Sequence, residues 1–148
     1  MTAFKYNVGL NWVADRKGEL HSTELNDKIE VATPPEFPGG IENIWSPEHL
    51  FTASVVSCFM TTFLAIAENS KLKFKHFSCD SEGILDKADG KFKMTEVILK
   101  PKLLILMEED REKALKVLDK AERACLITNS ISSEVKMNPD VQVLLPVN

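Results

Sequence analysis

The most distinctive hydrophobic pattern in the chain is an uncharged run of 18 residues, from Leu50 to Ala67. Helix-start signals stand directly before it: Ser46 is a good N-cap, Pro47 suits the first helical position, and Glu48 places a carboxylate at the positive end of the helix dipole. These signals predict a helix from about 47 to 69. Because such a helix is apolar nearly all round, other elements must cover it on several sides.

The same run reaches the length of a membrane span, about 18 apolar residues. Five of its positions are Ser or Thr, it has no flanking bias toward Lys or Arg, and amphipathic segments surround it. We therefore expect a core helix and no membrane partner. A chain of 148 residues has little material to cover so long an apolar helix, and we infer that a second subunit completes the cover.

Alternating apolar and polar positions predict strands before this helix. Residues 4–14 and 19–31 alternate in this way on either side of the polar turn 15–18, which is typical of a hairpin or meander. The next segment, 32–43, contains three prolines and two glycines. It cannot hold a regular ladder and is predicted to form a long ordered loop.

Three further elements are expected after the helix. Residues 73–85 and 92–106 both alternate as strands, and Asp89-Gly90 between them is a strong signal for a tight antiparallel turn. Residues 108–126 follow the helical period, and the apolar face that they form ends at Cys125. Residues 133–145 predict a final strand, with a kink or bulge at Asn138-Pro139.

Composition and charge narrow the class of protein. With 44% hydrophobic and 27% charged residues, a chain of this length suits one domain, 1–148. A formal charge of −4 supplies no basic face for nucleic acid or an acidic lipid surface. The N-terminus lacks the order of a secretory signal, so we expect a cytoplasmic protein whose thiols are kept reduced.

The three cysteines are the candidate chemical groups. They are odd in number and far apart, which argues against a structural disulfide framework. Cys58 lies within the central helix, and Cys125 ends the later one, where the helix dipole disfavours a thiolate. Cys125 would then be the poorer attacker of the two, while Cys79, in a strand, is taken as structural. Two core-facing cysteines can also be inert packing, and that alternative stays open.

A nucleophilic Cys58 needs a nearby cation, because burial opposes formation of the thiolate. Of the three arginines, Arg16 lies on a turn and is free to reach, whereas Arg123 should point to solvent. A guanidinium stays charged when partly buried and can fork onto a carboxylate, so we hypothesise a cluster of Arg16, Glu48 and Cys58. The alternative for Arg16 is a solvated turn residue.

The sequence gives little support for a metal site, a nucleotide site or a serine hydrolase site. The three histidines are scattered without metal-ligand spacing, and no dinucleotide, phosphate-binding or serine hydrolase motif occurs. We expect neither a metal nor an organic cofactor. The aromatic residues near Cys58 are either core or the wall of an apolar substrate pocket; they are Trp45, Phe51, Phe59 and Phe63.

Two stretches of the chain resemble the OsmC/Ohr family of osmotically inducible and organic hydroperoxide resistance proteins. They are WSPEHLFTASVVSCFMTTFLAIAE and, after a strand hairpin, KAERACLITNSI with its closing strand. The resemblance covers nearly the whole chain. It implies an α+β fold with antiparallel sheets packed around a long central helix, in an intertwined homodimer with two active sites across the interface. It also implies that Cys58 is the peroxidatic cysteine, Cys125 the resolving cysteine, and Glu48 the carboxylate that orients an arginine.

The chain departs from the family at two places. The hydroperoxide resistance branch often has Pro directly after its second cysteine, where this chain has Leu126. The Arg16 turn resembles the position of the activating arginine in that branch, while the loop before Pro47, where the OsmC branch carries its arginine, has none.

The resemblance implies a thiol peroxidase that reduces organic hydroperoxides to alcohols. Cys58 would become a sulfenic acid and then form a disulfide with Cys125, which an external dithiol, of the lipoyl type by resemblance, would reduce. The alternative is a non-catalytic dimer that binds an apolar small molecule in the same cleft.

Overall fold

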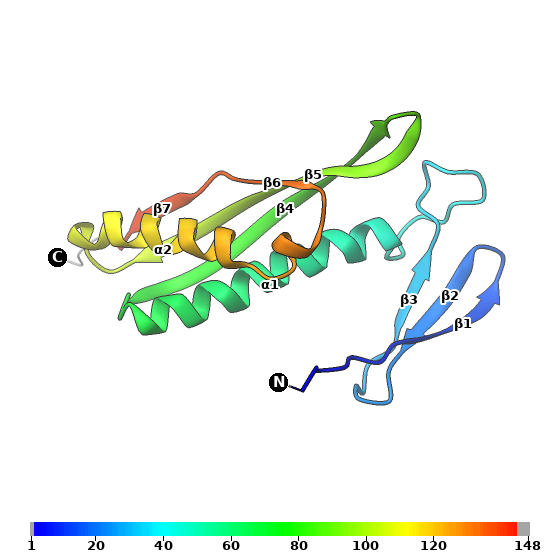
Figure 1. Ribbon diagram of the computed structural model, residues 1–148, viewed down its shortest axis with the longest axis horizontal. Helices are drawn as coiled ribbons and strands as arrows, with labels where there is room; N and C mark the ends of the chain where they lie inside the picture. Colours follow the sequence, from blue (N-terminus) through cyan, green and yellow to red (C-terminus); the bar gives the residue numbers. More distant parts are fainter. Residues whose placement is uncertain (1, 145–148) are drawn as a thin grey trace. The chain divides into compact units, whose positions relative to one another are not determined.

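The computed structural model describes residues 2–144 (Figure 1). Its elements are β1 (Gly9–Ala14), β2 (Lys17–His21), β3 (Ile29–Ala32), α1 (Pro47–Asn69), β4 (Phe74–Ala88), β5 (Lys91–Ile105), α2 (Arg111–Ala124), β6 (Glu134–Met137) and β7 (Asp140–Val143), with short 3-10 turns η1 (Glu108–Asp110) and η2 (Thr128–Ser130). The chain divides into two compact units, Met1–Leu50 and Phe51–Asn148.

The first unit contains the antiparallel sheet β1-β2-β3. The turn between β1 and β2 is made by Asp15 and Arg16, with Asp15 at a φ of 50°. Residues 33–44 form the predicted loop, which is anchored where Ala32 N–H donates to the Trp45 carbonyl at 2.9 Å. The predicted strand 19–31 is divided in two, because residues around Ser22 bond to the N-terminal segment instead: Ser22 Oγ donates to the Asn7 carbonyl at 2.6 Å.

The central helix α1 has the predicted bounds. Its cap is formed by the buried Ser46, whose Oγ accepts the His49 N–H at 3.1 Å and lies 2.7 Å from His49 Nδ1. The helix ends at Asn69, and Lys71 then takes a φ of 56°, which lets Leu72 N–H close back onto the Ala67 carbonyl at 2.9 Å. The prediction from the local start signals is confirmed.

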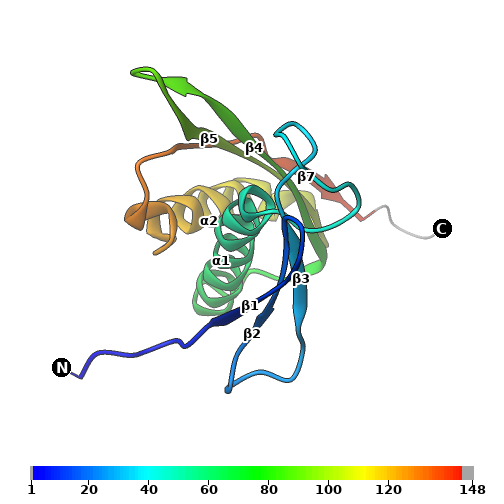
Figure 2. The same cartoon turned by 90° about the vertical axis from the view of Figure 1, so that its right-hand side faces the viewer.

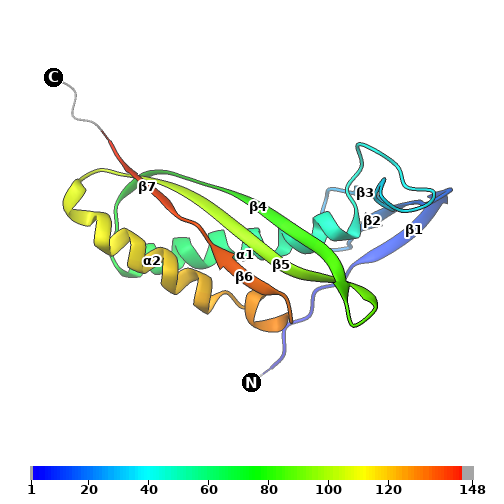
Figure 3. The ribbon, with the colours of Figure 1, turned by 90° about the horizontal axis from the view of Figure 1, so that it is seen from above.

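The sheet of the second unit is mixed. β4 and β5 form the predicted antiparallel hairpin, whose turn has positive φ at both Asp89 (53°) and Gly90 (79°). β6 and β7 follow one another along β5 and pair with it in parallel (Figure 3). The break between them falls at Asn138-Pro139, where a kink was predicted, and Asn138 N–H donates to the Leu99 carbonyl at 2.8 Å. Leu145, the last residue of that predicted strand, lies outside the described residues.

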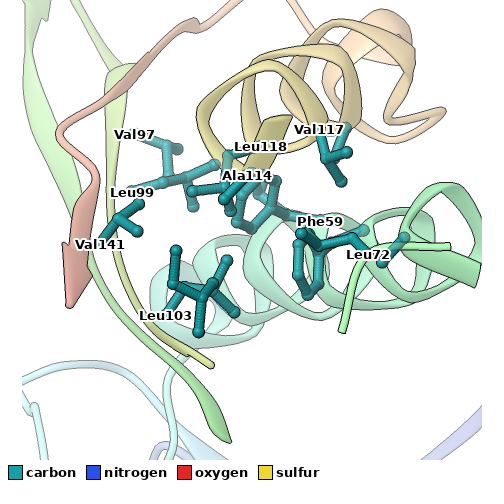
Figure 4. Packing of buried hydrophobic residues seen from close by; sticks show 14 residues of the cluster. Phe59, Leu72, Val97, Leu99, Leu103, Ala114, Val117, Leu118 and Val141 are labelled. Carbon is teal, nitrogen blue, oxygen red and sulfur yellow. The ribbon is translucent and has the colours of Figure 1, made fainter. Parts of the chain in front are cut away.

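Both helices of the second unit cover the same face of its sheet (Figure 2). The core between them is continuous, and Figure 4 shows Phe59 of α1, Leu118 of α2 and Leu99 of β5 within it. Phe63 of α1 stacks on Phe77 of β4 with ring centroids 4.6 Å apart. The buried side chains of α1 are spaced four residues apart, as one face of a helix requires; they are Val55, Phe59, Phe63 and Ala67.

The α+β fold class is therefore confirmed, with the refinement that one sheet is mixed. Among the described residues, α1 is the helix that is long and apolar enough to cross a membrane by length and composition, with a mean hydropathy of 1.9. Its buried face packs into the core of the second unit, as predicted for a core helix. The prediction of a single domain extends over 1–148, including residues outside the described range, and stays a prediction.

Candidate thiol site

The second unit brings together two of the predicted site residues, Cys58 and Cys125. Cys58 is half-buried in α1, one position before the fully buried Phe59. Cys125 is fully buried at the end of α2, where its backbone is already extended (ψ 118°). The Cys125 thiol lies close enough to the Cys58 sulfur to help lower the pKa of Cys58, and the Cys58 sulfur in turn helps to raise the pKa of Cys125. The two sulfurs that a disulfide would join are thus neighbours.

Four neighbouring groups act on the ionisation of Cys58. Burial is the largest single influence and opposes ionisation, but it is outweighed by donors that favour the thiolate. These donors are the Ile127 backbone, the Cys125 thiol, the Thr62 hydroxyl and the Leu126 backbone, and together they lower the pKa of Cys58. Thr62 lies one helical turn after Cys58, with Oγ1 3.9 Å from the sulfur.

The pKa of Cys125 moves in the opposite direction. Burial is the largest cause of the rise, and the neighbouring Cys58 sulfur adds to it, while the hydroxyl and backbone of Thr128 act against it. Because two adjacent thiolates repel each other, the pair loses its first proton from one sulfur, and the environment favours Cys58. Of the two neighbouring thiols, Cys58 is therefore the one whose pKa is lowered and Cys125 the one whose pKa is raised.

Cys79 has a different environment. It lies in β4, where burial raises its pKa to about 11, and its sulfur donates to the Asp80 carbonyl at 3.4 Å. This thiol stays protonated near neutral pH. Across residues 2–144 there is no group of three His, Cys, Asp or Glu side chains arranged to hold a metal ion.

Arg16 and Glu48 both belong to the first unit. Arg16 is exposed in the β1–β2 turn, and its side chain lies against Gly39, at which a Cβ would stand 3.0 Å from Arg16 Cγ. Gly39 has a φ of 78°. Glu48 is half-buried in the first turn of α1. Cys58 belongs to the second unit, and the cluster of Arg16, Glu48 and Cys58 stays a prediction.

The four aromatic residues fall into two groups. Trp45 is 52% exposed and makes an edge-on contact with the His49 ring, with centroids 6.2 Å apart. Phe51 is half-buried at the border of the core. Phe59 and Phe63 have no exposed surface and fill the core. A role for these residues in binding substrate is still a prediction, and Trp45 and Phe51 are the two with side-chain surface to offer.

Sequence reasoning did not identify the donors that surround the sulfurs. The spacing of Thr62 from Cys58, one helical turn, was a signal that could have found it. The amides of Leu126 and Ile127 leave no such signal, because every residue except proline carries the same backbone group. The departure at Leu126, where proline is common in the resembling branch, was the only indication that a donor stands there.

Comparisons with known proteins identify the family of the chain. The profile of the OsmC-like protein family matches residues 40–140. "Uncharacterized protein YmaD" of Bacillus subtilis is 26% identical over 150 residues, with 98% of each chain covered. Organic hydroperoxide resistance protein-like 1 of Staphylococcus epidermidis is 26% identical over 148 residues, covering 96% of this chain and 99% of the relative.

Solved structures show the same fold. An OsmC-like protein of unknown function from Vibrio cholerae has a TM-score of 0.83 at 23% identity, covering 93% of this chain and 99% of the other. An organic hydroperoxide resistance protein OsmC from Legionella pneumophila has a TM-score of 0.75 at 25% identity, covering 97% and 100%. Because the family profile spans well over half of the sequence, the chain belongs to the OsmC-like protein family.

Proposed function

We propose that the protein is a thiol-dependent peroxidase that reduces organic hydroperoxides to alcohols. The observation that carries the proposal is the neighbouring pair of Cys58, with a lowered pKa, and Cys125, with a raised one. A thiolate is the reactive form of cysteine, and a protonated thiol beside it is the partner that a resolving step needs. The names of two relatives, which are hydroperoxide resistance proteins, point to the same chemistry.

The first step is the attack of the Cys58 thiolate on the terminal oxygen of the hydroperoxide. The S–O bond forms as the O–O bond breaks, the electron pair of the O–O bond leaves on the alkoxide, and the alkoxide takes a proton from solvent to become the alcohol. Cys58 is oxidised to a sulfenic acid. Cys125 then attacks the Cys58 sulfur, the S–S bond forms, and the hydroxyl group leaves as water after taking the proton of the Cys125 thiol.

Regeneration requires an external dithiol, and we propose one of the lipoyl type from the family resemblance. Two successive thiol exchanges return both cysteines to the reduced form and leave the dithiol as a disulfide. Such a cycle suits a compartment that maintains reduced thiols, and we expect the cytoplasm. No metal or organic cofactor takes part in this sequence.

We assign Arg16 and Glu48 to activation of Cys58. A guanidinium beside the sulfur would stabilise the thiolate beyond what neutral donors achieve, and a carboxylate would hold that guanidinium in place. The Arg16 side chain has both the exposure and the charge for this role. Trp45 and Phe51 would then supply the apolar wall for the organic part of the hydroperoxide, with Phe59 and Phe63 supporting it from the core.

We further propose that the active form is a homodimer. Each unit leaves apolar surface uncovered: in the first unit, alternate residues of the N-terminal segment are exposed, including Tyr6 (84%) and Trp12 (76%). In the second, Met60 (40%) and Leu64 (42%) are exposed on α1. A second copy of the chain is the partner that would cover both surfaces in every molecule, as the intertwined dimer of the resemblance implies.

Mass spectrometry after a single turnover tests the peroxidase. The reduced protein is treated with one equivalent of cumene hydroperoxide and digested without reductant. We expect a loss of two hydrogens and a linked pair of peptides that contain Cys58 and Cys125, and the same result for the control Cys79→Ser. Unchanged mass and unlinked peptides would favour the alternative, a non-catalytic dimer that binds an apolar small molecule.

A further inference from the structure

The loop 33–44 is tied to the β1–β2 turn through its first residue, and it is drawn in cyan between β3 and α1 in Figure 1. Where the pairing of β2 with β3 ends, the Thr33 N–H donates to the Arg16 carbonyl at 3.3 Å. The Thr33 carbonyl in turn accepts the Ile41 N–H at 2.9 Å. Thr33 therefore holds the far part of the loop close to the backbone of Arg16.

Two successive turns fill the loop between these bonds. The Phe37 N–H donates to the Pro34 carbonyl at 3.1 Å, and the Gly40 N–H donates to the Phe37 carbonyl at 2.9 Å. The second turn has Pro38 at its first central position and Gly39, with a φ of 78°, at its second, which is the pattern of a type II turn. The dipeptide Pro38-Gly39 therefore favours one backbone conformation at this point of the loop.

The two glycines of this turn have different neighbours. A Cβ at Gly40 would overlap the Pro34 carbonyl group, so the loop packs backbone against backbone there. The three atoms nearest to a Cβ at Gly39 would all belong to the Arg16 side chain: Cγ at 3.0 Å, Nε at 3.1 Å and Cδ at 3.6 Å. Three consecutive atoms of the Arg16 side chain therefore lie along the bare backbone of Gly39.

This contact restricts the direction of the Arg16 guanidinium. Arginine has several rotatable bonds, and a surface beneath three consecutive atoms reduces the number of rotamers that they can adopt. Cγ is the second carbon of the side chain, so moving it requires a change of the first side-chain torsion, which swings every later atom with it. An added methyl group at Gly39 would press on this carbon and redirect the charge at the end of the side chain.

We propose that the Pro38-Gly39 turn is a seat that positions the Arg16 guanidinium, and that Gly39 is a positioning residue for the activation of Cys58. The proposal rests on the proposed function, which assigns Arg16 to that activation. The attraction between a cation and a thiolate weakens with distance, so an arginine on an exposed turn acts on a sulfur only if its direction is controlled. The loop 33–44 supplies that control through a backbone without a side chain at the point of contact.

The seat is tested first on Arg16 itself, by a measurement that requires no enzyme activity. The chain has three arginines, so the Nε–H signal of Arg16 in the nitrogen-15 NMR spectrum is assigned by its loss in Arg16→Ala. In Gly39→Ala we expect this signal to shift and its order parameter on the ps–ns timescale to fall, because the side chain leaves the turn. The Nε–H signals of Arg111 and Arg123 should stay where they are in the parent.

Gly90→Ala is the matched control for backbone strain. Gly90 has a φ of 79°, against 78° at Gly39, but across residues 2–144 no atom beyond its chain neighbours lies within 4 Å of the Cβ that it would carry. Both variants place a methyl group on a left-handed backbone and should unfold at a lower urea concentration than the parent. Only Gly39→Ala should move the Arg16 signal. A signal that is unchanged in Gly39→Ala, or moved equally by both variants, overturns the seat.

A second variant guards against a Gly39→Ala protein that does not fold. Pro38→Ala removes the ring that fixes φ at the first central position of the turn, and it adds no side-chain atom over Gly39. The looser turn should lower the order parameter of the Arg16 Nε–H in the same direction. Where Gly39→Ala fails to fold, an Arg16 signal that is unchanged in Pro38→Ala overturns the seat.

The consequence for Cys58 is measured by the pH profile of its alkylation with iodoacetamide, followed by mass spectrometry of the Cys58 peptide. In Gly39→Ala we expect alkylation near neutral pH to slow by up to about tenfold, the effect expected for Arg16→Ala, because the cation is displaced. The double variant Gly39→Ala/Arg16→Ala should match Arg16→Ala alone, since Gly39 acts through Arg16.

The same profiles separate the seat from the proposed function. A double variant that is clearly slower than Arg16→Ala would show that Gly39 acts by another route, and it would overturn the positioning role. If Arg16→Ala leaves the Cys58 profile unchanged while Gly39→Ala still moves the Arg16 signal, the seat is retained and the assignment of Arg16 to the activation of Cys58 is overturned.

Discussion

The sulfurs of Cys58 and Cys125 lie close enough to shift each other's ionisation, so that Cys125 helps to lower the pKa of Cys58 while Cys58 helps to raise that of Cys125. The two residues are 67 positions apart in the chain. They meet because α1 and α2 pack on the same face of one sheet, which places the end of α2 beside the middle of α1. The asymmetry of their environments then decides which sulfur ionises.

We predict that Arg16 raises the reactivity of Cys58. In Arg16→Ala the pKa of Cys58 should rise, because a cation that favours the thiolate is removed, and the rate of Cys58 alkylation near neutral pH should fall by about tenfold. Arg123→Ala is the matched control, since Arg123 is exposed on α2 and pairs with Asp119 at 2.8 Å. Identical pH profiles for the two variants would remove Arg16 from the site.

We predict a loss of stability at high pH because of the half-buried thiol Cys79. Its pKa is raised from an ordinary 9.0 to about 11, so the native state retains a proton that the unfolded state releases. The stabilisation is complete below pH 9 and is lost as the pH rises toward 11; because solvent screens a half-buried thiol, we expect a loss of about 1 kcal/mol. Urea unfolding at these two limits should show a smaller decrease for Cys79→Ala than for the parent. An equal decrease in both would place the alkaline sensitivity in other groups.

The cap of α1 explains why its start could be predicted from sequence, and it is testable. Ser46→Ala removes a buried hydroxyl that accepts the His49 N–H, and we expect a loss of about 1–2 kcal/mol in the free energy of unfolding. Ser57→Ala is the matched control, because the Ser57 hydroxyl bonds only to carbonyls of its own helix and alanine has the higher helix propensity. That control should be neutral or slightly stabilising in urea unfolding, and a comparable loss in both variants would contradict the assignment of the cap.

We predict that Phe63 contributes to stability through its place in the core. Its side chain is fully buried and stacks on Phe77, so Phe63→Ala should lower the free energy of unfolding by about 3–5 kcal/mol. Leu115→Ala, at a residue 39% exposed on α2, should lower it by less than about 1 kcal/mol. If Phe63→Ala unfolds at the urea concentration of the parent, the packing described here is wrong.

Local signals were sufficient for the elements that depend on neighbouring residues. The start of α1 depends on Ser46 and Pro47, and the β4–β5 turn depends on Asp89-Gly90, so both could be predicted. The parallel pairing of β6 and β7 with β5 could not, because it joins distant segments through a crossover by α2. Alternation predicts a strand, but it does not select its partner.

The candidate site, like the fold, could be predicted from the sequence only in part. The two cysteines could be chosen from the apolar faces on which they lie, and their contact depends on tertiary packing that no spacing reveals. The donors from Leu126 and Ile127 are backbone groups of a turn, set by the bonds that Asn129 and Ser130 make to its carbonyls. The predicted end of the second helix at Leu126 was two residues too late, and it would have hidden this turn.

The most direct test of the central claim is the consumption of cumene hydroperoxide by the reduced protein in the absence of an added reductant. We predict that the parent consumes one equivalent per chain and then stops, because the disulfide traps both cysteines. Cys58→Ser should consume none, and Cys125→Ser should complete one turnover and proceed to over-oxidation of Cys58 when peroxide is in excess. A Cys58→Ser protein that consumes the hydroperoxide at the rate of the parent would contradict the proposal that the Cys58 thiolate is the reacting group.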